Sequence, residues 1–489
     1  MNKFYSPHIL SQRYGRYIFL LMSFLILFAG GVHLSLGASP QVIFIAGMTV
    51  FASFLPMFFL GVYNIPAILT ALVGMRFVGF PLFIKLFYLQ PFDSYLVDPL
   101  GTTLVIFIGM MGYVLSAVIT NKISVGRNLL RPMTRSSRLA KIGAYTFIIV
   151  LLLNFVKAND EKMPGLLVSL SKFYVDFIYL ALVASIAYSY TKGKLDISTI
   201  IFFFAGLVFA VTRNARSAIL FLLLALVLTS QTYKIKINFK RLIFIGIALG
   251  VLYLYITPIF LKARSQRASR TWQEQVQMTI NSAVNWNETF EWYQYYQTLT
   301  EQYKEGLSGR LTYYGRSTNA LDRVSYISTV DIFKVGADKQ GFVGFDDLRI
   351  SLIRAIPNFI GIEKPLGYGH GSWLFLQAGV ENPGPYPVAT LLGAGYLAFG
   401  WFGAFLYPLI LGCVLIFALK KVSGLFLVNN IWAIYFFMRI QNFFIEGATD
   451  AYIGMILRTI PQDLLLIFLI ISLSKIRFSD KSLQKQPVV

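Results

Sequence analysis

Residues that could do chemistry gather in one stretch of the sequence, from Ser351 to Trp373. This stretch combines Arg354, Lys364 and His370 with two prolines, which fix the backbone, and four glycines, which free it. A shaped, cationic turn held against a membrane is what an anionic lipid headgroup would need. From this stretch alone, a Pro/Gly-rich surface loop without a binding role is an equally open interpretation.

Further cations stand at the ends of apolar runs. Arg213 and Arg216 separate two short runs, 197–212 and 216–231, and Arg323 lies in a predicted helical segment further on. A charge at membrane depth costs about 2.5–3.5 kcal/mol, so it usually faces a cavity or a partner. Snorkelling at a helix end is the alternative. It brings no topological advantage to arginines on the outer side, and we therefore favour an anion site.

The chemistry that these five cations permit is phosphate binding. Guanidinium groups bind phosphate through two parallel hydrogen bonds. A pyrophosphate leaving group gains charge as its bond breaks, and donors aimed at that charge stabilise the transition state by a few kcal/mol, about 3 in typical cases. The predicted pyrophosphate-binding residues are Arg213, Arg216, Arg323, Arg354 and Lys364.

A sugar-transfer reaction would also need a base for the acceptor hydroxyl. His370 has a suitable ordinary pKa, although a single histidine in a Gly-rich loop is more often structural. Glu446 and Asp450 lie in a predicted outer loop, 442–450, where ion pairing with nearby arginines is the alternative to catalysis. The candidate catalytic residues are His370, Glu446 and Asp450, with Asp346, Asp347 and Glu363 as competitors.

Other chemistries lack their sequence signatures. The three histidines are scattered, no zinc-ligand spacing exists, and Cys413 is the single cysteine, within an apolar run where it serves packing. No GxSxG elbow, Walker A loop or dinucleotide-binding GxGxxG occurs in its required context. We therefore expect neither a metal nor a cofactor.

The elements that position these residues are membrane helices. The chain has 489 residues, of which 56% are hydrophobic and 13% charged, and apolar runs recur along its whole length. The first run lacks a cleavage site for a signal peptide, so it is predicted to be a transmembrane helix. We predict an all-α polytopic membrane protein with about twelve spans: 17–36, 41–62, 65–88, 99–120, 142–157, 166–190, 197–212, 216–231, 242–261, 388–419, 424–440 and 459–474.

The net charge of +21 is distributed by topology. The segments that we assign to the cytoplasm are both terminal tails and the loops on the same side. They hold 21 of the 43 Lys and Arg residues against two acidic residues, Asp196 and Asp480. The long segment 262–386 is nearly balanced, with 13 basic and 12 acidic residues. The positive-inside rule explains this asymmetry, places both termini in the cytoplasm and makes nucleic-acid binding unnecessary.

Three regions follow: N-terminal spans over 1–261, a large outer lobe over 262–387, and C-terminal spans with a cytoplasmic tail over 388–489. The run 388–419 contains four glycines near its start, which predicts a short broken or re-entrant piece before the true span. Within the lobe, the aromatic residues between 272 and 303 could stack on sugars or form an interfacial belt, and we favour the belt.

The sequence resembles a family, the bacterial O-antigen and oligosaccharide repeat-unit polymerases, usually called Wzy. The resemblance covers residues 200–420. It rests on the paired Arg213 and Arg216, an arginine-led helix at Asp322-Arg323, the run Leu352-Ile-Arg-Ala-Ile-Pro357 followed by Lys364-Pro365, and the Gly-rich run from Leu391 through Gly403.

The resemblance implies a metal-independent glycosyltransferase of the inner membrane with a GT-C-like polymerase architecture and a periplasmic loop. It would move a growing glycan from undecaprenyl pyrophosphate onto a new lipid-linked repeat unit. Arg213, Arg216, Arg323 and Arg354 would hold the donor pyrophosphate, with Lys364 in support. The implied partners are the two lipid-linked oligosaccharides and membrane lipid; a chain-length regulator and a flippase are further candidates. Two lipid carriers imply a lateral opening between helices.

Two alternatives remain open. An O-antigen ligase would share the donor but transfer to lipid A core, so the acceptor distinguishes it. A transporter or flippase of lipid-linked oligosaccharides would favour charges deep in several spans and a repeat relation between halves. Here the charges concentrate at the outer face and in the lobe, which favours an enzyme.

Overall fold

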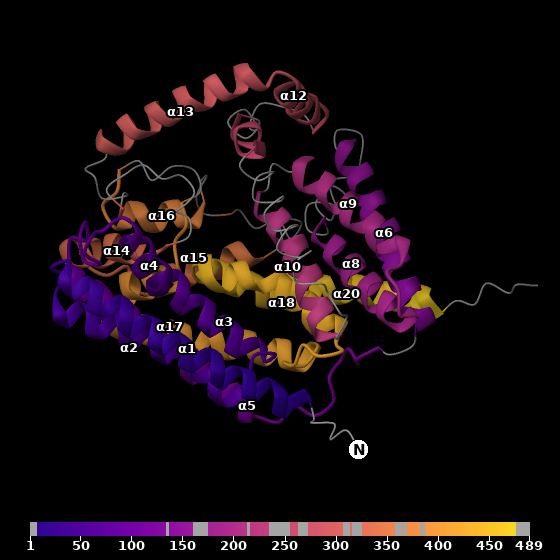
Figure 1. Ribbon diagram of the computed structural model, residues 1–489, viewed down its shortest axis with the longest axis horizontal. Helices are drawn as coiled ribbons and strands as arrows, with labels where there is room; N and C mark the ends of the chain where they lie inside the picture. The colour runs from indigo at the N-terminus through magenta and orange to yellow at the C-terminus, as the bar shows by residue number, and fades with distance from the viewer. Residues whose placement is uncertain are drawn as a thin grey trace, which may run out of the picture.

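A computed structural model gives the arrangement of the helices (Figure 1). It describes residues 7–133, 136–159, 175–212, 216–233, 255–262, 272–306, 313–314, 325–356, 364, 369–381 and 387–475. Throughout these ranges the regular secondary structure is helical, apart from one isolated β-bridge between Asn64 and Phe426. The prediction of an all-helical fold is confirmed for the described residues.

Seven of the described helical stretches are long and apolar enough to cross a membrane. They contain the helices α1 (Pro7–Ser35), α2 (Pro40–Leu60), α3 to α4 (Ile65–Phe87, with a π-helical turn η1 at Met75–Gly79), α5 (Pro99–Lys122), α6 (Ser136–Ala158), α17 (Leu391–Val422), and α19 (Thr449–Gly454) to α20 (Ile460–Lys475). Other predicted spans correspond to shorter helices, namely α8 (Ile178–Lys192), α9 (Ile197–Thr212), α10 (Arg216–Thr232) and α18 (Ile431–Glu446). The predicted span 242–261 lies mostly outside the described residues.

Helix α18 is the most enclosed element near the site, because all but three of its 16 residues are buried. The predicted span 424–440 was misplaced. Gly424 and Asn429 have positive φ, which interrupts the helix, and the side chain of Asn430 accepts a hydrogen bond from the backbone N–H of Ala433 as an N-cap. The helix therefore begins at Ile431 and continues to Glu446, so Glu446 stands in its last turn and not in an outer loop.

The first part of α17 is broken from the rest of the helix, one of the two forms that the glycines predicted. The helix breaks at Gly400, whose φ of +61° and ψ of −138° no helix contains. Gly395 and Gly403 lie face to face across this break, since a Cβ on Gly395 would stand 2.4 Å from the carbonyl oxygen of Gly403. The short piece before Gly400 is thus folded back against the true span that follows.

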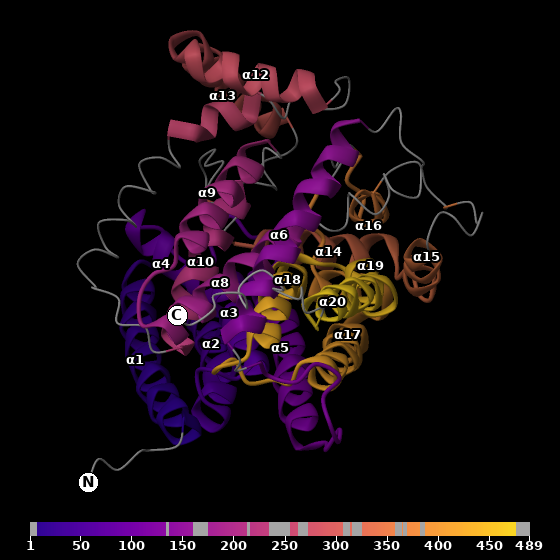
Figure 2. The same cartoon turned by 90° about the vertical axis from the view of Figure 1, so that its right-hand side faces the viewer.

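The predicted outer lobe has two differently placed parts. Helices α12 (Trp272–Val284) and α13 (Trp286–Gly306) lie at the end of the molecule away from the N-terminus (Figure 2). Tyr255 and Trp286 stack there with ring centroids 3.9 Å apart. The later helices α14 (Ile327–Gln340), α15 (Asp346–Ala355) and α16 (His370–Gln377) pack into the bundle instead.

One buried carboxylate fixes this second part. Asp331 of α14 accepts hydrogen bonds from the backbone N–H groups of Val97 and Asp98 at 2.9 and 3.0 Å, and from the hydroxyl of Thr102 at 2.7 Å. It thereby joins α14 to the start of α5. Helix α15 in turn packs on α19, which brings Arg354 and the rest of α15 against the C-terminal helices.

Candidate active site

Two adjoining cavities lie at the far end of α18. Tyr63 joins the N-terminal helix to the segment before α18: its backbone N–H donates to the hydroxyl of Ser11, and its carbonyl oxygen accepts from the N–H of Leu427. The start of α18 therefore lies on the side of the N-terminus. Its last turn and the following turn at Gly447 and Ala448 therefore lie on the opposite side. We call the larger hollow the cationic cavity and the smaller one the acidic cavity.

The cationic cavity has a volume of about 440 Å³, within the range of about 300–1,000 Å³ usual for small-molecule sites. Three arginines and two aspartates are its charged lining residues. The full lining consists of Asp176, Arg354, Ala355, Arg439, Phe443, Asp450, Ala451, Gly454, Met455, Arg458 and Thr459. Its polarity suits an anion.

Arg354 comes from the last turn of α15, and its guanidinium lies 3.9 Å from the carboxylate of Asp450. Both side chains are about a quarter exposed. This distance is at the limit of an ion pair and too long for a hydrogen bond. Arg354 is thus placed at the cavity wall without a short bond to this carboxylate.

Lys364 contributes charge in a different way from the one predicted. Its ammonium donates to the carbonyl oxygens of Ile353 and Arg354 at 3.2 and 2.7 Å, and also to that of Ile356. These are carbonyls at the C-terminus of α15, so Lys364 caps that helix. Because its three N–H donors point to the backbone, it supports Arg354 and adds positive charge nearby.

The pKa of Lys364 is lowered, first by burial and then by the positive charges of Arg458 and Arg354. Like charges within a few ångströms disfavour each other's charged forms. The lowered pKa therefore reflects burial first and nearby positive charge second, and a bound anion would offset the second cause.

Arg439 also lines the cationic cavity, but two carboxylates hold it. Its guanidinium pairs with Asp176 and lies 3.3 Å from Asp463, which also accepts a hydrogen bond from Tyr435 at 3.0 Å. The side chain of Asp463 is fully buried, and that of Arg439 is 7% exposed. This arrangement is a structural ion-pair network, but its carboxylates are Asp176 and Asp463 and not Glu446 and Asp450 of the predicted outer loop.

Arg458 lies in a π-helical turn, η7 (Met455–Thr459), within the last membrane helix. Such turns are rare overall. Where they occur, they often lie at functional sites, because the extra residue redirects side chains. Gly454 precedes this turn with ordinary helical φ and ψ, and a Cβ there would meet no atom within 4 Å. The glycine thus leaves open space in the cavity wall.

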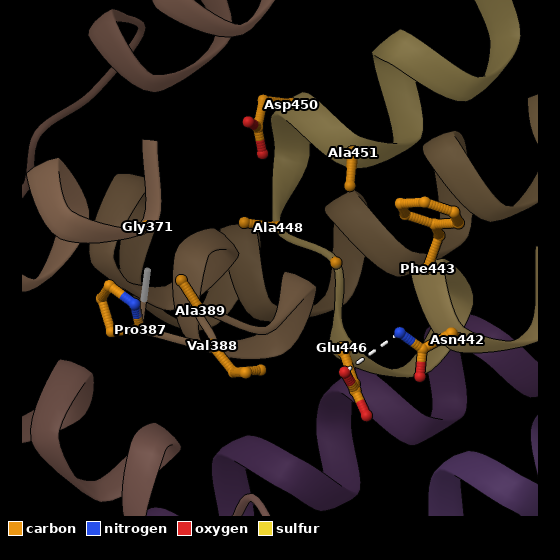
Figure 3. A pocket seen from close by; sticks show the side chains of 11 residues that line it. Gly371, Pro387, Val388, Ala389, Asn442, Phe443, Glu446, Ala448, Asp450 and Ala451 are labelled. Atoms are coloured by element: carbon orange, nitrogen blue, oxygen red, sulfur yellow. Dashed lines mark hydrogen bonds between the residues drawn. The ribbon is translucent and has the colours of Figure 1, made fainter. Parts of the chain in front are cut away.

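The acidic cavity has a volume of about 250 Å³. Figure 3 shows its two facing walls, Pro387 to Ala389 on one side and the end of α18 with the start of α19 on the other. Glu446 and Asp450 are its charged lining residues, and the structure places no cation in the lining among the residues it describes.

Glu446 is anchored from behind by three side chains. Its Oε1 lies 2.7 Å from Arg76 Nη2 and accepts a hydrogen bond from the hydroxyl of Tyr326 at 2.6 Å. Its Oε2 accepts a hydrogen bond from Asn442 at 3.1 Å. Burial and the neighbouring carboxylate raise the pKa of Tyr326, so its hydroxyl stays protonated and donates.

Asp450 borders both cavities, together with Phe443 and Ala451. It stands in the first turn of α19, directly after the turn that ends α18. A carboxylate on a shared wall can face reactants from both sides. Of the three predicted catalytic residues, Asp450 is the one best placed to take a proton between two bound molecules.

His370 lies behind the site and not in it. Its side chain is fully buried, with Nε2 2.7 Å from Asp347 and 3.3 Å from the hydroxyl of Ser351. Asp347 also accepts a hydrogen bond from Thr449 at 2.6 Å. This network ties α15 and α16 to the start of α19. The structure therefore assigns His370 a positioning role, since its ring reaches neither cavity.

The remaining predicted cations are not placed at the site. Arg213 and Arg323 lie outside the described residues. Arg216 begins α10, but its side chain is also outside what the structure describes. Among the described residues, no group of three or more His, Cys, Asp and Glu side chains is arranged to hold a metal ion.

Sequence analysis missed Arg76 and counted Arg458 only among the arginines near the predicted outer loop, 442–450. Both are arginines within membrane-length helices, and both fall in π-helical turns. Ionisable residues inside an apolar span are themselves a signal of function. That signal was available for both positions in the sequence.

Comparison with known proteins adds no relative, because no family model, no curated protein and no solved structure matches the chain.

Proposed function

We propose that this protein is a glycosyltransferase of the bacterial inner membrane, an O-antigen polymerase. It transfers a growing polysaccharide from undecaprenyl pyrophosphate to a new undecaprenyl-pyrophosphate-linked repeat unit. The observation that carries the proposal is the position of Asp450, on the wall between a cationic cavity and an acidic one and 3.9 Å from Arg354.

The donor pyrophosphate binds in the cationic cavity. Arg354 and Arg458 line it, and Lys364 adds positive charge behind Arg354. Guanidinium groups there bind the phosphate oxygens and stabilise the charge that grows on the leaving group. Arginines thus supply the positive charge for leaving-group departure.

The transfer step needs one base. The acceptor hydroxyl oxygen forms a bond to the anomeric carbon of the donor sugar, and the bond from that carbon to the pyrophosphate oxygen breaks. The hydroxyl proton passes to the carboxylate of Asp450, and undecaprenyl pyrophosphate leaves with the bonding electrons. Glu446, already bonded to Arg76 and Tyr326, orients the acceptor.

The proposal includes a topology. The site faces the periplasm, both termini are cytoplasmic, and about twelve spans in a GT-C-like architecture carry the chain across the membrane. The excess of Lys and Arg on the other side supports this orientation. A chain-length regulator and a flippase are the proposed protein partners.

The test introduces a large side chain at Gly454, in the wall of the cationic cavity, so that the side chain occupies the cavity. Purified protein in nanodiscs receives synthetic undecaprenyl-pyrophosphate-linked repeat units without nucleotide, and products are separated on a gel. Gly454→Trp places an indole where a Cβ meets no atom, so it should fold but lose the product ladder. The matched control Gly454→Ala should keep the ladder and gain about 0.5–1 kcal/mol of stability, since alanine favours a helix.

Other outcomes overturn the proposal. A folded Gly454→Trp protein that polymerises normally would remove the cationic cavity from the reaction. Transfer by the parent protein to lipid A core, without polymerisation, would identify a ligase. Silence in both assays, with transport of lipid-linked oligosaccharide into or across vesicles, would identify a transporter.

A further inference from the structure

The acidic cavity differs from its neighbour in a way that constrains the acceptor. The two cavities share Phe443, Asp450 and Ala451. One is lined by three arginines and two aspartates, and the other by two carboxylates with no described cation. A single elongated anion site would not change sign along its length. The two halves therefore select different chemical groups.

The size of the acidic cavity limits its ligand. Its volume of about 250 Å³ lies just below the range of about 300–1,000 Å³ for drug-sized ligands. The wall residues Pro387, Val388, Ala389, Ala448 and Ala451 are small and apolar. The space suits one sugar ring and not an extended chain.

The polar groups suit hydroxyls. The carboxylate of Glu446 and the amide of Asn442 are bonded to each other, which fixes both side chains at the cavity wall (Figure 3). Carboxylate and amide oxygens accept hydrogen bonds from hydroxyl groups. The ring of Phe443 is 40% exposed and offers an apolar face to the C–H groups of a sugar ring.

We infer that the acidic cavity binds the terminal sugar of the acceptor and selects an uncharged or amino sugar over an acidic one. This inference rests on the proposed function, which supplies the acceptor. A uronic acid would bring a third carboxylate beside Glu446 and Asp450, and like charges brought together in a partly desolvated site disfavour binding. The same sugar would lack a cation in the described lining to offset that repulsion.

The test measures equilibrium binding of matched sugars to the full-length protein in nanodiscs by saturation-transfer NMR. The probes are methyl glycosides in pairs, glucose with glucuronic acid and galactose with galacturonic acid, together with N-acetylated amino sugars. We expect at least one neutral sugar to bind at least about tenfold more tightly than its acidic partner, a factor equal to about 1.4 kcal/mol. Asp450→Asn should narrow that ratio.

Two filling variants separate the cavities. Val388→Trp fills a partly buried wall position that belongs to the acidic cavity alone, so it should abolish binding of the methyl glycosides. It should keep binding of a short-chain prenyl pyrophosphate sugar, apart from contacts that the sugar of this ligand makes in the acidic cavity. Gly454→Trp should do the reverse. Val388→Phe is the smaller substitution if the tryptophan prevents folding, which thermal unfolding will show.

Each alternative outcome has a distinct meaning. Acidic sugars that bind as tightly as their neutral partners, sugar binding that survives folded Val388→Trp, or no binding by any sugar at its highest soluble concentration would overturn this inference. In all three cases the Gly454 ladder would still decide the proposed function. A normal ladder with Gly454→Trp would instead remove the cationic cavity from the reaction, while polymerisation and sugar selectivity would both stay measurable.

Discussion

Arg439 and Arg354 line the same cavity but stand in opposite situations. Arg439 comes from the buried helix α18, and Asp176 and Asp463 hold its guanidinium. Arg354 comes from the end of α15, is about a quarter exposed, and stands 3.9 Å from one carboxylate. Position in a cavity lining therefore does not show which arginine serves a ligand.

The difference lies in what each charge stabilises. A buried arginine between carboxylates offsets their desolvation, so its removal leaves uncompensated charge inside the protein. An arginine that is about a quarter exposed at a cavity wall costs less to remove from the fold than a buried one, and its guanidinium can also reach a bound anion. We therefore assign Arg439 to stability and Arg354 to the pyrophosphate.

The largest effect is expected for Arg439→Ala. It leaves the fully buried Asp463 without its cation, which should lower the free energy of unfolding by about 3–5 kcal/mol. Thermal unfolding in detergent measures the change. Adding Asp463→Asn to this variant should recover part of the loss. A variant as stable as the parent but unable to bind pyrophosphate would place Arg439 beside Arg354 in function.

Much of the arrangement could be predicted from the sequence, for identifiable reasons. Hydropathy located the long helices, and glycines located the break at Gly400, because both signals are local. Arg354 and Asp450 were chosen as a candidate anion ligand and a candidate base, and both line the cationic cavity, although their predicted roles stay predictions. The start of α18 was wrong because Gly424 to Asn430 is apolar enough to resemble a helix, although its backbone is not helical.

The pairings could not be predicted. Arg76 and Glu446 are 370 positions apart, and Asp176 and Arg439 are 263 apart, so a single sequence gives no indication that they meet. His370 was a candidate base because of its ordinary pKa and its place in the Ser351–Trp373 stretch. The structure instead buries it against Asp347, which only packing between α15 and α16 reveals.

Arg354→Ala should leave the fold intact and impair the reaction. Loss of one donor to a developing negative charge typically slows turnover about 100- to 1,000-fold. The change in stability should stay within about 0.5 kcal/mol. The ladder assay and thermal unfolding measure the two quantities on the same preparation.

A control on the same helix sharpens this result. Arg349 of α15 pairs with Asp346 at 3.0 Å on the surface, and its side chain is 70% exposed. Arg349→Ala removes an equal charge from the same helix. Because Arg349 does not line the cationic cavity, this variant should keep normal turnover. Equal losses in both variants would mean that the general charge of α15, and not contact with pyrophosphate, sets the rate.

The smallest effect is a proton taken up by Lys364 when the anion binds. The folded pKa of this lysine lies below its ordinary value of 10.5, owing to burial and then to Arg458 and Arg354. Between these two pKa values the unfolded chain holds more protons than the folded protein, so the free energy of unfolding rises with pH across this window. A bound anion offsets the neighbouring cations and raises the folded pKa. Binding should then take up a fraction of a proton in the same window.

Calorimetry in two buffers of different ionisation enthalpy measures that uptake. The ligand is a short-chain prenyl pyrophosphate sugar, a diester that does not itself titrate at alkaline pH. Uptake should vanish in Lys364→Met and shrink in Arg354→Ala, because Arg354 is one of the charges that lower the pKa of Lys364. Arg349→Ala, whose charge does not lower that pKa, should leave uptake unchanged. If binding takes up no proton although the ligand binds, the anion does not offset the charges of Arg354 and Arg458 on Lys364, and the pyrophosphate must be placed elsewhere.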